Sequence, residues 1–453
     1  MGTIEKTYMV FVLSLLLATV GLGSLASWAF LYPETFNNYL PFYQLRPLHV
    51  SSALFWIISG GVVCILHFKK ELFPKRSDVS EKTFMYGWII TLLVILLFYS
   101  LKKFGGREYW EFPPLLSIPL LLSWILLMTS YFSGWRKTIG KQPLFVWMWS
   151  TGILFFLITF IEQNLWNVPW FRQTLLREIT VQWKSNGSMV GAWNQMIYGS
   201  ALFLMVKISG DGYLARSKKA FFFYFLGLAN LMFNWGHHIY NVPTAGWIRH
   251  VSYAISMTEW LIFISIVRGF KQKLDETRKF KYLTSYKFLL ASEFWIFANL
   301  FLALFMSIPA INRYTHGTHI TVAHAMGTTV GINTMILLGA ISCIIQIDAL
   351  KEEVRKRLNV YYWITQFSLT AFWLSLIGAG ILKGYRNVAL RIEPFQELMK
   401  PVLAVLEVFA YSGIGLMIGI GGIAIILIKN FHNAPQHYLP PDQNVCVWKN
   451  ANR

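Results

Sequence analysis

Charged side chains are scarce in this sequence. Asp, Glu, Lys and Arg make up 13% of its 453 residues, whereas a soluble domain carries roughly 25%. This scarcity excludes an ordinary soluble protein, because the chain cannot cover itself with a water-facing surface. Apolar runs take the place of the missing charge along nearly the whole length, and they are long enough to be membrane-spanning helices.

Cysteines are also few, and they follow no pattern. Cys64, Cys343 and Cys446 lie far apart, without Cys-x-x-Cys or Cys-x-x-Cys-His spacing. This excludes a disulfide framework, a zinc knuckle and a covalent c-type haem on this chain. The first apolar run follows Met1–Lys6 and ends near Phe30 without a small-residue cleavage site, so we expect a retained helix rather than a signal peptide.

The apolar runs predict an all-α integral membrane protein of about twelve helices. Its connections are too short to hold separate domains, so we expect residues 1–453 to form a single polytopic domain. The many tryptophans fit a belt at the membrane interfaces. The expected spans lie near residues 8–30, 47–68, 84–101, 114–133, 143–162, 185–207, 218–240, 249–268, 286–308, 317–348, 359–382 and 402–428.

Basic residues alternate with the spans. Every second connection is rich in Lys and Arg, and the positive-inside rule places these connections and both termini in the cytoplasm. The net charge of +19 therefore reflects topology, and the strict alternation argues against a nucleic-acid partner. The basic connections are Lys69–Lys82, Arg136–Lys141, Lys207–Lys219, Arg268–Lys287 and Lys351–Arg357.

Six of the ten histidines lie in three short segments: Arg46–His49, Gly236–His238 and Thr315–Met326. The topology puts His49, His237 and His238 near the outer ends of their spans, with His324 roughly 10–15 Å deep at 1.5 Å per residue. An interhelical hydrogen bond would explain one such histidine but not the set, because histidines inside spans are rare and usually functional. Imidazole suits iron, copper or zinc, and the spacing alone selects none of them.

In two pairs of these residues, the two side chains are expected to point in different directions. His324 and Met326 are two apart and therefore point to nearly opposite sides of one helix, which suits two different haems. His237 and His238 point about 100° apart on a regular helix. They can share one metal only where the helix opens or where the metal lies between them.

Taken together, these residues resemble the haem–copper oxidase superfamily, and within it the large subunit of cytochrome-c-dependent nitric oxide reductase. The resemblance covers nearly the whole chain and implies the twelve-helix subunit I bundle. It is carried by the span-2 histidine His49, Gly105–Glu111, Gly236–His238, Glu259, and Thr315–Thr318 with Ala323–His324.

The resemblance also implies roles for the histidines. His49 would be an axial ligand of a low-spin haem b, and His324 the proximal ligand of a high-spin haem b. His237 and His238 would hold a non-haem metal, expected to be iron, that faces the high-spin haem.

For the acidic residues, the resemblance makes Glu108 a calcium ligand near the haem propionates and places Glu111 at the proton entrance. Glu259 matches a buried glutamate with a proton-handling role, for which a structural hydrogen bond is the alternative. Outer arginines are candidate partners of the propionates, and they are Arg46, Arg107, Arg249 and Arg313.

The sequence departs from the family at the second low-spin ligand. Where the family has His-Gly-His, this chain has His324, Ala325 and Met326. Methionine is a known axial ligand, and His/Met ligation raises the haem potential relative to two histidines. The alternative is that Met326 only packs.

The second departure concerns the non-haem metal. An alignment on neighbouring Trp and Gly residues puts Asn186 in place of a third histidine and Val190 in place of a glutamate. An asparagine oxygen is a weak, uncharged ligand for a hard metal. The related nitric oxide dismutases carry the same histidine-to-asparagine change.

The resemblance thus implies an enzyme of the bacterial cytoplasmic membrane that reduces two NO to N2O and water, with its site towards the periplasm. Its electrons would come from a membrane-anchored cytochrome c subunit, because this chain has no Cys-x-x-Cys-His. Three alternatives stay open: a nitric oxide dismutase, a non-enzymatic haem protein for sensing or electron transfer, and an oxygen reductase. The last is less favoured because span 6 or 7 has no suitably placed His–Tyr pair.

Overall fold

The computed structural model describes residues 2–72, 79–133, 139–240, 242–255, 257–258 and 280–431, except the side chains of residues 214, 223, 234 and 237. Over these ranges the chain is helical, and the β-structure is confined to an isolated bridge between Arg107 and Trp110. The predicted all-α class is therefore confirmed. Glu259 lies outside the described residues, as does the side chain of His237.

Ten helical segments in the described ranges are long and apolar enough to cross a membrane. Shorter helices lie between them in the sequence: α2 (Pro33–Phe36), α7 (Pro169–Arg172), α9 (Lys218–Phe233) and α13 (Pro309–Thr315). The long segments are α1 (Thr3–Leu31), α3 (Phe42–Leu72), α4 (Val79–Ser100), α5 (Ser117–Phe132) with the turn before it, α6 (Leu144–Gln163) with the turn after it, α8 (Leu175–Ser209), α12 (Leu283–Ser307), α14 (His319–Met326) continuing through α15 (Met335–Ile345), α16 (Glu352–Val388) and α17 (Phe395–Phe431).

The predicted count of twelve spans differs from these ten in two places. The expected span 218–240 is α-helical only to Phe233, and it continues as the 3-10 turn η5 (Asn234–Ile239). The expected span 249–268 falls largely outside the described residues, and the described beginning of it is helical. The count of twelve stays a prediction that is consistent with the fold.

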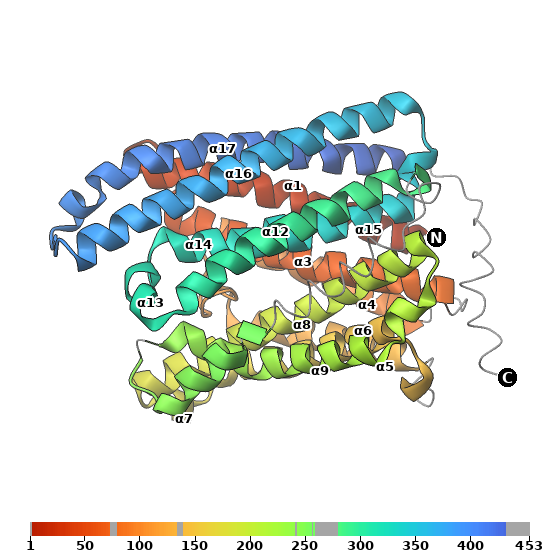
Figure 1. The fold of residues 1–453 in the computed structure, drawn as a ribbon, viewed down its shortest axis with the longest axis horizontal. Coiled ribbons are helices and arrows are strands. Elements are labelled where there is room, and N and C mark those ends of the chain that lie inside the picture. Colours follow the sequence, from red (N-terminus) through yellow and green to blue (C-terminus); the bar gives the residue numbers. More distant parts are fainter. Residues whose placement is uncertain are drawn as a thin grey trace.

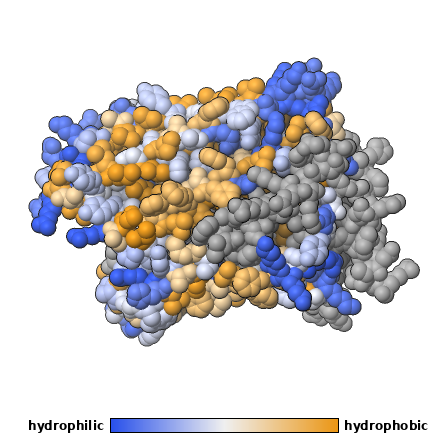
Figure 2. Space-filling model, in the orientation of Figure 1, coloured by the Kyte–Doolittle hydropathy of each residue, from blue (hydrophilic) through white to orange (hydrophobic). Residues whose placement is uncertain are grey.

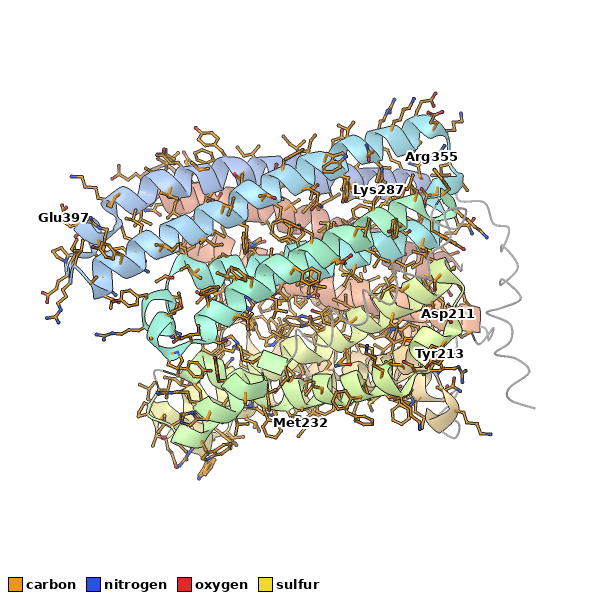
Figure 3. The ribbon with its side chains drawn as sticks, in the orientation of Figure 1. Asp211, Tyr213, Met232, Lys287, Arg355 and Glu397 are labelled. Carbon is orange, nitrogen blue, oxygen red and sulfur yellow. The ribbon has the colours of Figure 1, made fainter. Side chains whose placement is uncertain are left out.

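The bundle is elongated, and its helices run between two polar ends. Figure 1 shows the N-terminus at one end and the short helices α7 and α13 at the other. Side chains from three of the predicted cytoplasmic connections (Asp211, Lys287 and Arg355) lie at the end with the N-terminus, and Glu397 lies at the opposite end (Figure 3). In Figure 2 hydrophobic residues cover the middle of the molecule and hydrophilic residues gather at its ends. This arrangement is that of an integral membrane protein.

Several helices are longer than the apolar runs predicted. For example, α8 begins at Leu175 rather than near 185, and α17 runs to Phe431. Hydropathy detects only the part of a helix that lies in the bilayer. Polar residues extend the same helix into the interface, and Thr174 caps α8 by accepting a hydrogen bond from the Arg177 amide.

The expectation of an interfacial tryptophan belt was wrong for part of the set. Five tryptophans are almost completely buried in the core: Trp56, Trp88, Trp124, Trp149 and Trp295. Each donates its indole N–H to a group on another helix, as Trp56 does to Thr334 Oγ1 at 3.0 Å. Such bonds join helices in a medium where no water can satisfy a buried donor.

Candidate functional site

A cavity of about 1030 Å³ lies inside the bundle, between α1, α3, α8, α12, α14 and α17. Most of its lining is apolar. It contains nearly all the predicted site residues whose side chains are described: His49, Asn186, His238, His324, Met326 and Glu108. Helices far apart in sequence thus bring these candidates together, as the topology predicted.

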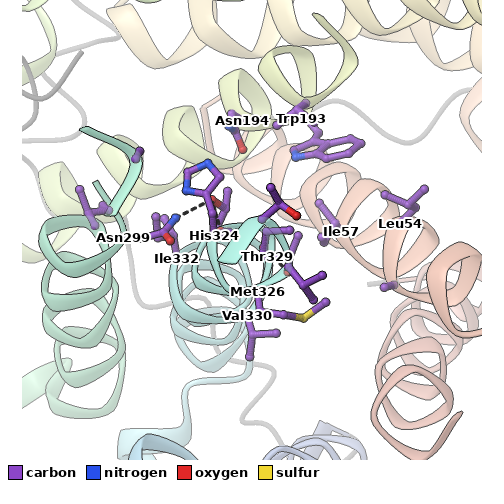
Figure 4. Close-up of a pocket in the computed structure, with 18 of the residues that line it drawn as sticks. Leu54, Ile57, Trp193, Asn194, Asn299, His324, Met326, Thr329, Val330 and Ile332 are labelled. Atoms are coloured by element: carbon purple, nitrogen blue, oxygen red, sulfur yellow. Dashed lines mark hydrogen bonds between the residues drawn. The ribbon is translucent and has the colours of Figure 1, made fainter. Parts of the chain in front are cut away.

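His324 and Met326 lie on opposite sides of one helix. In Figure 4 the His324 ring projects towards Trp193 and Asn194 of α8, and Met326 lies on the far side near Val330. After Met326 the helix widens into the π-helical segment η6 (Gly327–Thr334). Such π-helical segments are rare, and they often occur at functional sites. The geometry agrees with the expectation that the two residues serve different haems.

Hydrogen bonding orients the His49 ring. Its Nδ1 lies 3.0 Å from the carbonyl oxygen of Thr19 on α1, so Nδ1 carries the proton that it donates. This leaves Nε2 with its lone pair, the form in which a histidine binds a metal. A Cβ on Gly23 would lie 2.6 Å from the His49 ring, so only glycine leaves room for it. These contacts fit the predicted role of His49 as an axial ligand.

His238 faces the other half of the cavity. Its ring stacks on Trp183 of α8, with centroids 5.4 Å apart and planes 11° from parallel. It is also close enough to His324 for their charges to interact. His238 lies on the 3-10 turn η5. Such a turn has three residues per turn, so neighbouring side chains point about 120° apart, and a metal shared with His237 would have to lie between the two residues.

Asn186 is buried in the same half, but its oxygen is already engaged. Oδ1 accepts hydrogen bonds from Gln163 and, at 3.4 Å, from Gln182. Gln182 also donates to Gln163 Oε1 at 2.8 Å. Only the amide oxygen can bind a metal, so ligation by Asn186 requires these bonds to break. Within the described ranges, no three His, Cys, Asp or Glu residues are grouped as a metal site.

Glu108 lines the cavity from a tight turn that also holds Glu111. Tyr109 takes a left-handed conformation there, with φ of 76°, which is strained for a non-glycine residue. Arg46 on α3 lies 2.6 Å from Glu111 and 3.7 Å from Glu108. Burial raises the pKa of the Glu108 carboxyl, and the Arg46 charge partly offsets that rise.

Among the four arginines proposed for propionates, only Arg46 lines the cavity. Arg107 pairs with Glu178 at 2.7 Å and lies over the Trp166 ring. Arg249 donates to the Tyr240 carbonyl oxygen at 2.6 Å. Sequence patterns did not identify Gln163 and Gln182, whose side chains donate to Asn186 Oδ1, because isolated glutamines in a span match no motif.

Comparisons with known proteins identify the family of this chain. The protein family described as cytochrome c and quinol oxidase polypeptide I matches residues 3–415. A nitric oxide reductase subunit from Stutzerimonas stutzeri is 22% identical over 84% of each chain. Cytochrome c oxidase subunit 1 of Rhodobacter capsulatus is also 22% identical, over 84% of this chain and 74% of that protein.

A solved structure shows the same fold. A haem–copper terminal oxidase dimer, determined by cryo-electron microscopy, superposes with a TM-score of 0.73 at 14% sequence identity. The superposition covers 98% of this chain and 89% of that one. With a family match over most of its length, this chain belongs to the haem–copper oxidase subunit I family and is an oxidoreductase of that superfamily.

Proposed function

We propose that this protein is the catalytic subunit of a respiratory nitric oxide reductase. It would reduce two NO to N2O and water with electrons from cytochrome c. The observation that carries the proposal is the placement of His49, Met326, His324 and His238 around one apolar cavity. Identity to the relatives does not distinguish NO from O2 as substrate, and the Arg107–Glu111 turn of the reductase resemblance favours NO.

The residues suggest how the electron-accepting side would work. Bound haems would supply the one-electron chemistry that no side chain here provides. His49, oriented by the Thr19 carbonyl, and Met326 would hold a low-spin haem b between them. His324 would hold a high-spin haem b on the other face of the same helix, so one short segment would connect the two haems.

On the other side of the cavity, His237 and His238 would hold the non-haem metal, expected to be iron. The apolar walls suit a small uncharged gas such as NO. Glu111, paired with Arg46 at the outer mouth, would pass protons inwards. Glu108 would bind calcium, and Glu259 would take part in proton handling near the metal.

Electron supply follows from the missing c-type haem motif. We infer a membrane-anchored cytochrome c subunit that docks at the outer end of the bundle. The complex would lie in the bacterial cytoplasmic membrane, with the site towards the periplasm. The surrounding lipid contacts the apolar middle of the bundle seen in Figure 2.

Asn186 favours a second candidate, a nitric oxide dismutase that converts NO to N2 and O2. Its oxygen is engaged by glutamine amides, and Val190 offers no anionic ligand. This metal site is therefore poorer in ligands than the family pattern. Such a change at the metal side, with the haem side retained, is compatible with altered chemistry on the same scaffold.

The test uses the purified complex with its co-purifying partner under anaerobic conditions. Isotope-labelled NO is supplied with and without reduced cytochrome c, and N2O, N2 and O2 are followed by mass spectrometry. Donor-dependent N2O would support the reductase, and donor-independent N2 with O2 would establish dismutation. Absence of turnover on NO, with donor-dependent O2 consumption in a second run, would point to an oxygen reductase.

A further inference from the structure

His319 stands in the wall of the cavity without an assigned role. It is the first residue of α14 and lies seven residues before Met326. Seven residues are two turns with a drift of about 20°, so the two side chains share one helix face. His319 lies roughly 10 Å nearer the outer end, at 1.5 Å per residue. It therefore belongs to the half of the cavity that Met326 faces.

The His319 ring carries an unsatisfied polar atom. Its Nδ1 is inaccessible to solvent and has no hydrogen-bond partner in the part of the chain that the structure describes. A buried polar group without a partner lowers the stability of the fold, so native structures rarely keep one unless a ligand, ion or water completes it. His319 lines the cavity, so a turn of its ring about the Cβ–Cγ bond would bring this nitrogen to the cavity's occupant.

Lys383 lies near His319. Lys383 of α16 donates to the Gly317 carbonyl oxygen at 3.1 Å and is close enough to His319 for their charges to interact. Two glycines permit this closeness: a Cβ on Gly380 would lie 2.5 Å from the Ile320 nitrogen, and one on Gly384 would overlap a backbone oxygen of α13. The packing of α16 against α14 thus places a cation beside His319.

The opposite wall shows a matching arrangement. Arg46 lies three residues, or about one turn, before His49 on α3, and it lines the cavity. Both predicted ligands of the low-spin haem therefore have a basic group on the same face, displaced towards the outer end. Arg46 already has two carboxylate partners, Glu108 and Glu111, whereas the buried nitrogen of His319 has none among the described residues.

We propose that His319, with Lys383 behind it, binds a carboxylate of the cofactor held by His49 and Met326, namely a haem propionate. The ring N–H would donate to the carboxylate oxygen, and the lysine charge would favour the ionised carboxylate, since charge-assisted hydrogen bonds are strong. This inference rests on the haem-binding part of the proposed function. It makes His319 a cofactor-positioning residue and requires no gas turnover.

The experiment compares His319→Ala and His319→Gln in the whole complex. Haem content per protein, the reduced-minus-oxidised spectrum of each haem, its midpoint potential, and the rate of haem transfer to an excess of apomyoglobin are measured without NO. His250→Ala is the matched control, because His250 is exposed and outside the cavity. Lys383→Met is paired with Lys400→Met, which removes an exposed lysine on α17.

The expected result is selective for the low-spin haem. His319→Ala should speed its loss roughly tenfold, as supporting residues of cofactor sites do. His319→Gln keeps an N–H donor and should recover part of the effect. Lys383→Met should shift the low-spin midpoint potential to a more negative value, since a nearby cation favours the reduced haem. The high-spin haem and both controls should behave as the wild type.

Three results would overturn the proposal. Haem loss and potential unchanged from the His250→Ala control would show that His319 binds no propionate. Loss of the low-spin spectrum itself would make His319 an axial ligand. Selective release of the high-spin haem would assign the carboxylate to the other cofactor.

If His319→Ala fails to fold, a measurement on the wild-type protein and the lysine variants still tests the proposal. Redox-difference infrared spectra of haem labelled with 13C at its propionates should show a carboxylate band that moves in Lys383→Met but not in Lys400→Met. A wild type that lacks haem would refute the proposed function. A wild type that contains both haems but does not turn over NO would contradict the proposed NO reduction. The propionate inference would still be tested by the haem measurements.

Discussion

The two halves of the cavity are built differently. His49 and Met326 face one half from α3 and from the α14 segment, and the Thr19 carbonyl fixes the His49 ring. The other half is lined by α8 and η5, where Asn186 is tied to glutamines and His238 lies on a 3-10 turn. On the haem side the resemblance predicts a ligand pair with one histidine replaced by a methionine, whereas on the metal side it predicts the loss of a histidine and a glutamate relative to the family pattern.

This difference between the two halves suggests that electron entry is kept while the reaction at the metal site can change. Electron entry needs two axial ligands on opposite walls, and methionine can replace histidine there at the cost of a changed potential. The reaction outcome depends on the non-haem metal and on the groups that bring protons to it. We therefore expect variants on the haem side to affect cofactor content and potential, and variants on the metal side to affect products.

The largest expected effect comes from His324, which links the two halves. His324→Ala should lower NO turnover by at least ~100-fold, because loss of a direct ligand exceeds the effect of a supporting residue. The low-spin spectrum should persist, since His324 and Met326 face opposite sides. Turnover is followed by mass spectrometry and the haems by difference spectroscopy. Loss of both haems with the fold intact would contradict the division of the cavity into two sites.

Met326 tests the haem side alone. Met326→Ala should abolish the low-spin spectrum, whereas Met326→His should keep it and shift the midpoint potential to a more negative value, because two histidines stabilise the oxidised haem. A spectroelectrochemical titration measures both. A low-spin haem unchanged in Met326→Ala would show that Met326 only packs.

On the metal side, Asn186→His should raise the non-haem iron content roughly tenfold if that position supplies a ligand. Gln163→Leu is the companion variant, because it removes one of the two hydrogen bonds to the Asn186 oxygen without adding a ligand, and it should have a smaller effect. Iron per protein, corrected for haem, is measured by mass spectrometry. Equal iron in Asn186→His and Asn186→Ala would remove Asn186 from the ligand set.

Glu108 carries the smallest predicted effect. Burial raises its pKa in the folded protein above about 4.3, the ordinary value of an unfolded chain. Its contribution to stability is therefore fully present below that value and is lost as the pH rises through the raised pKa. Without calcium, Glu108→Gln should be at least as stable as the wild type at pH 7, and this advantage should vanish in acid.

Calcium should make the wild type more stable than Glu108→Gln. A ligand at 100 times its Kd stabilises by about 2.7 kcal/mol, so calcium should raise the thermal midpoint of the wild type but not that of Glu108→Gln. Thermal scans with chelator and with calcium measure this. An equal response in both proteins would exclude Glu108 as a calcium ligand.

Much of the fold could be predicted from local patterns. Apolar runs and alternating basic connections predicted an all-α bundle, and side chains from three of these connections lie at one end of it (Figure 3). The divergence of His324 and Met326 followed from helical periodicity. The break at Phe233 could not be predicted, because an apolar run looks the same whether its backbone is α-helical or 3-10.

By itself, the sequence determined which residues form the apolar spans and where the histidines fall along them, because apolar runs and a fixed rise per residue are local properties. The haem roles of these histidines are what the family resemblance implies. Tertiary structure decided which neighbours those residues meet. Thr19 orients His49, glutamines occupy the Asn186 oxygen, and Lys383 stands behind His319. The hydrogen bonds of Thr19, Gln163 and Lys383 at these places join residues 23 to 66 positions apart in the chain. Side-chain partners of this kind depend on how the helices pack. The sequence of one helix carries no local signal that says which residues of another helix will lie beside it.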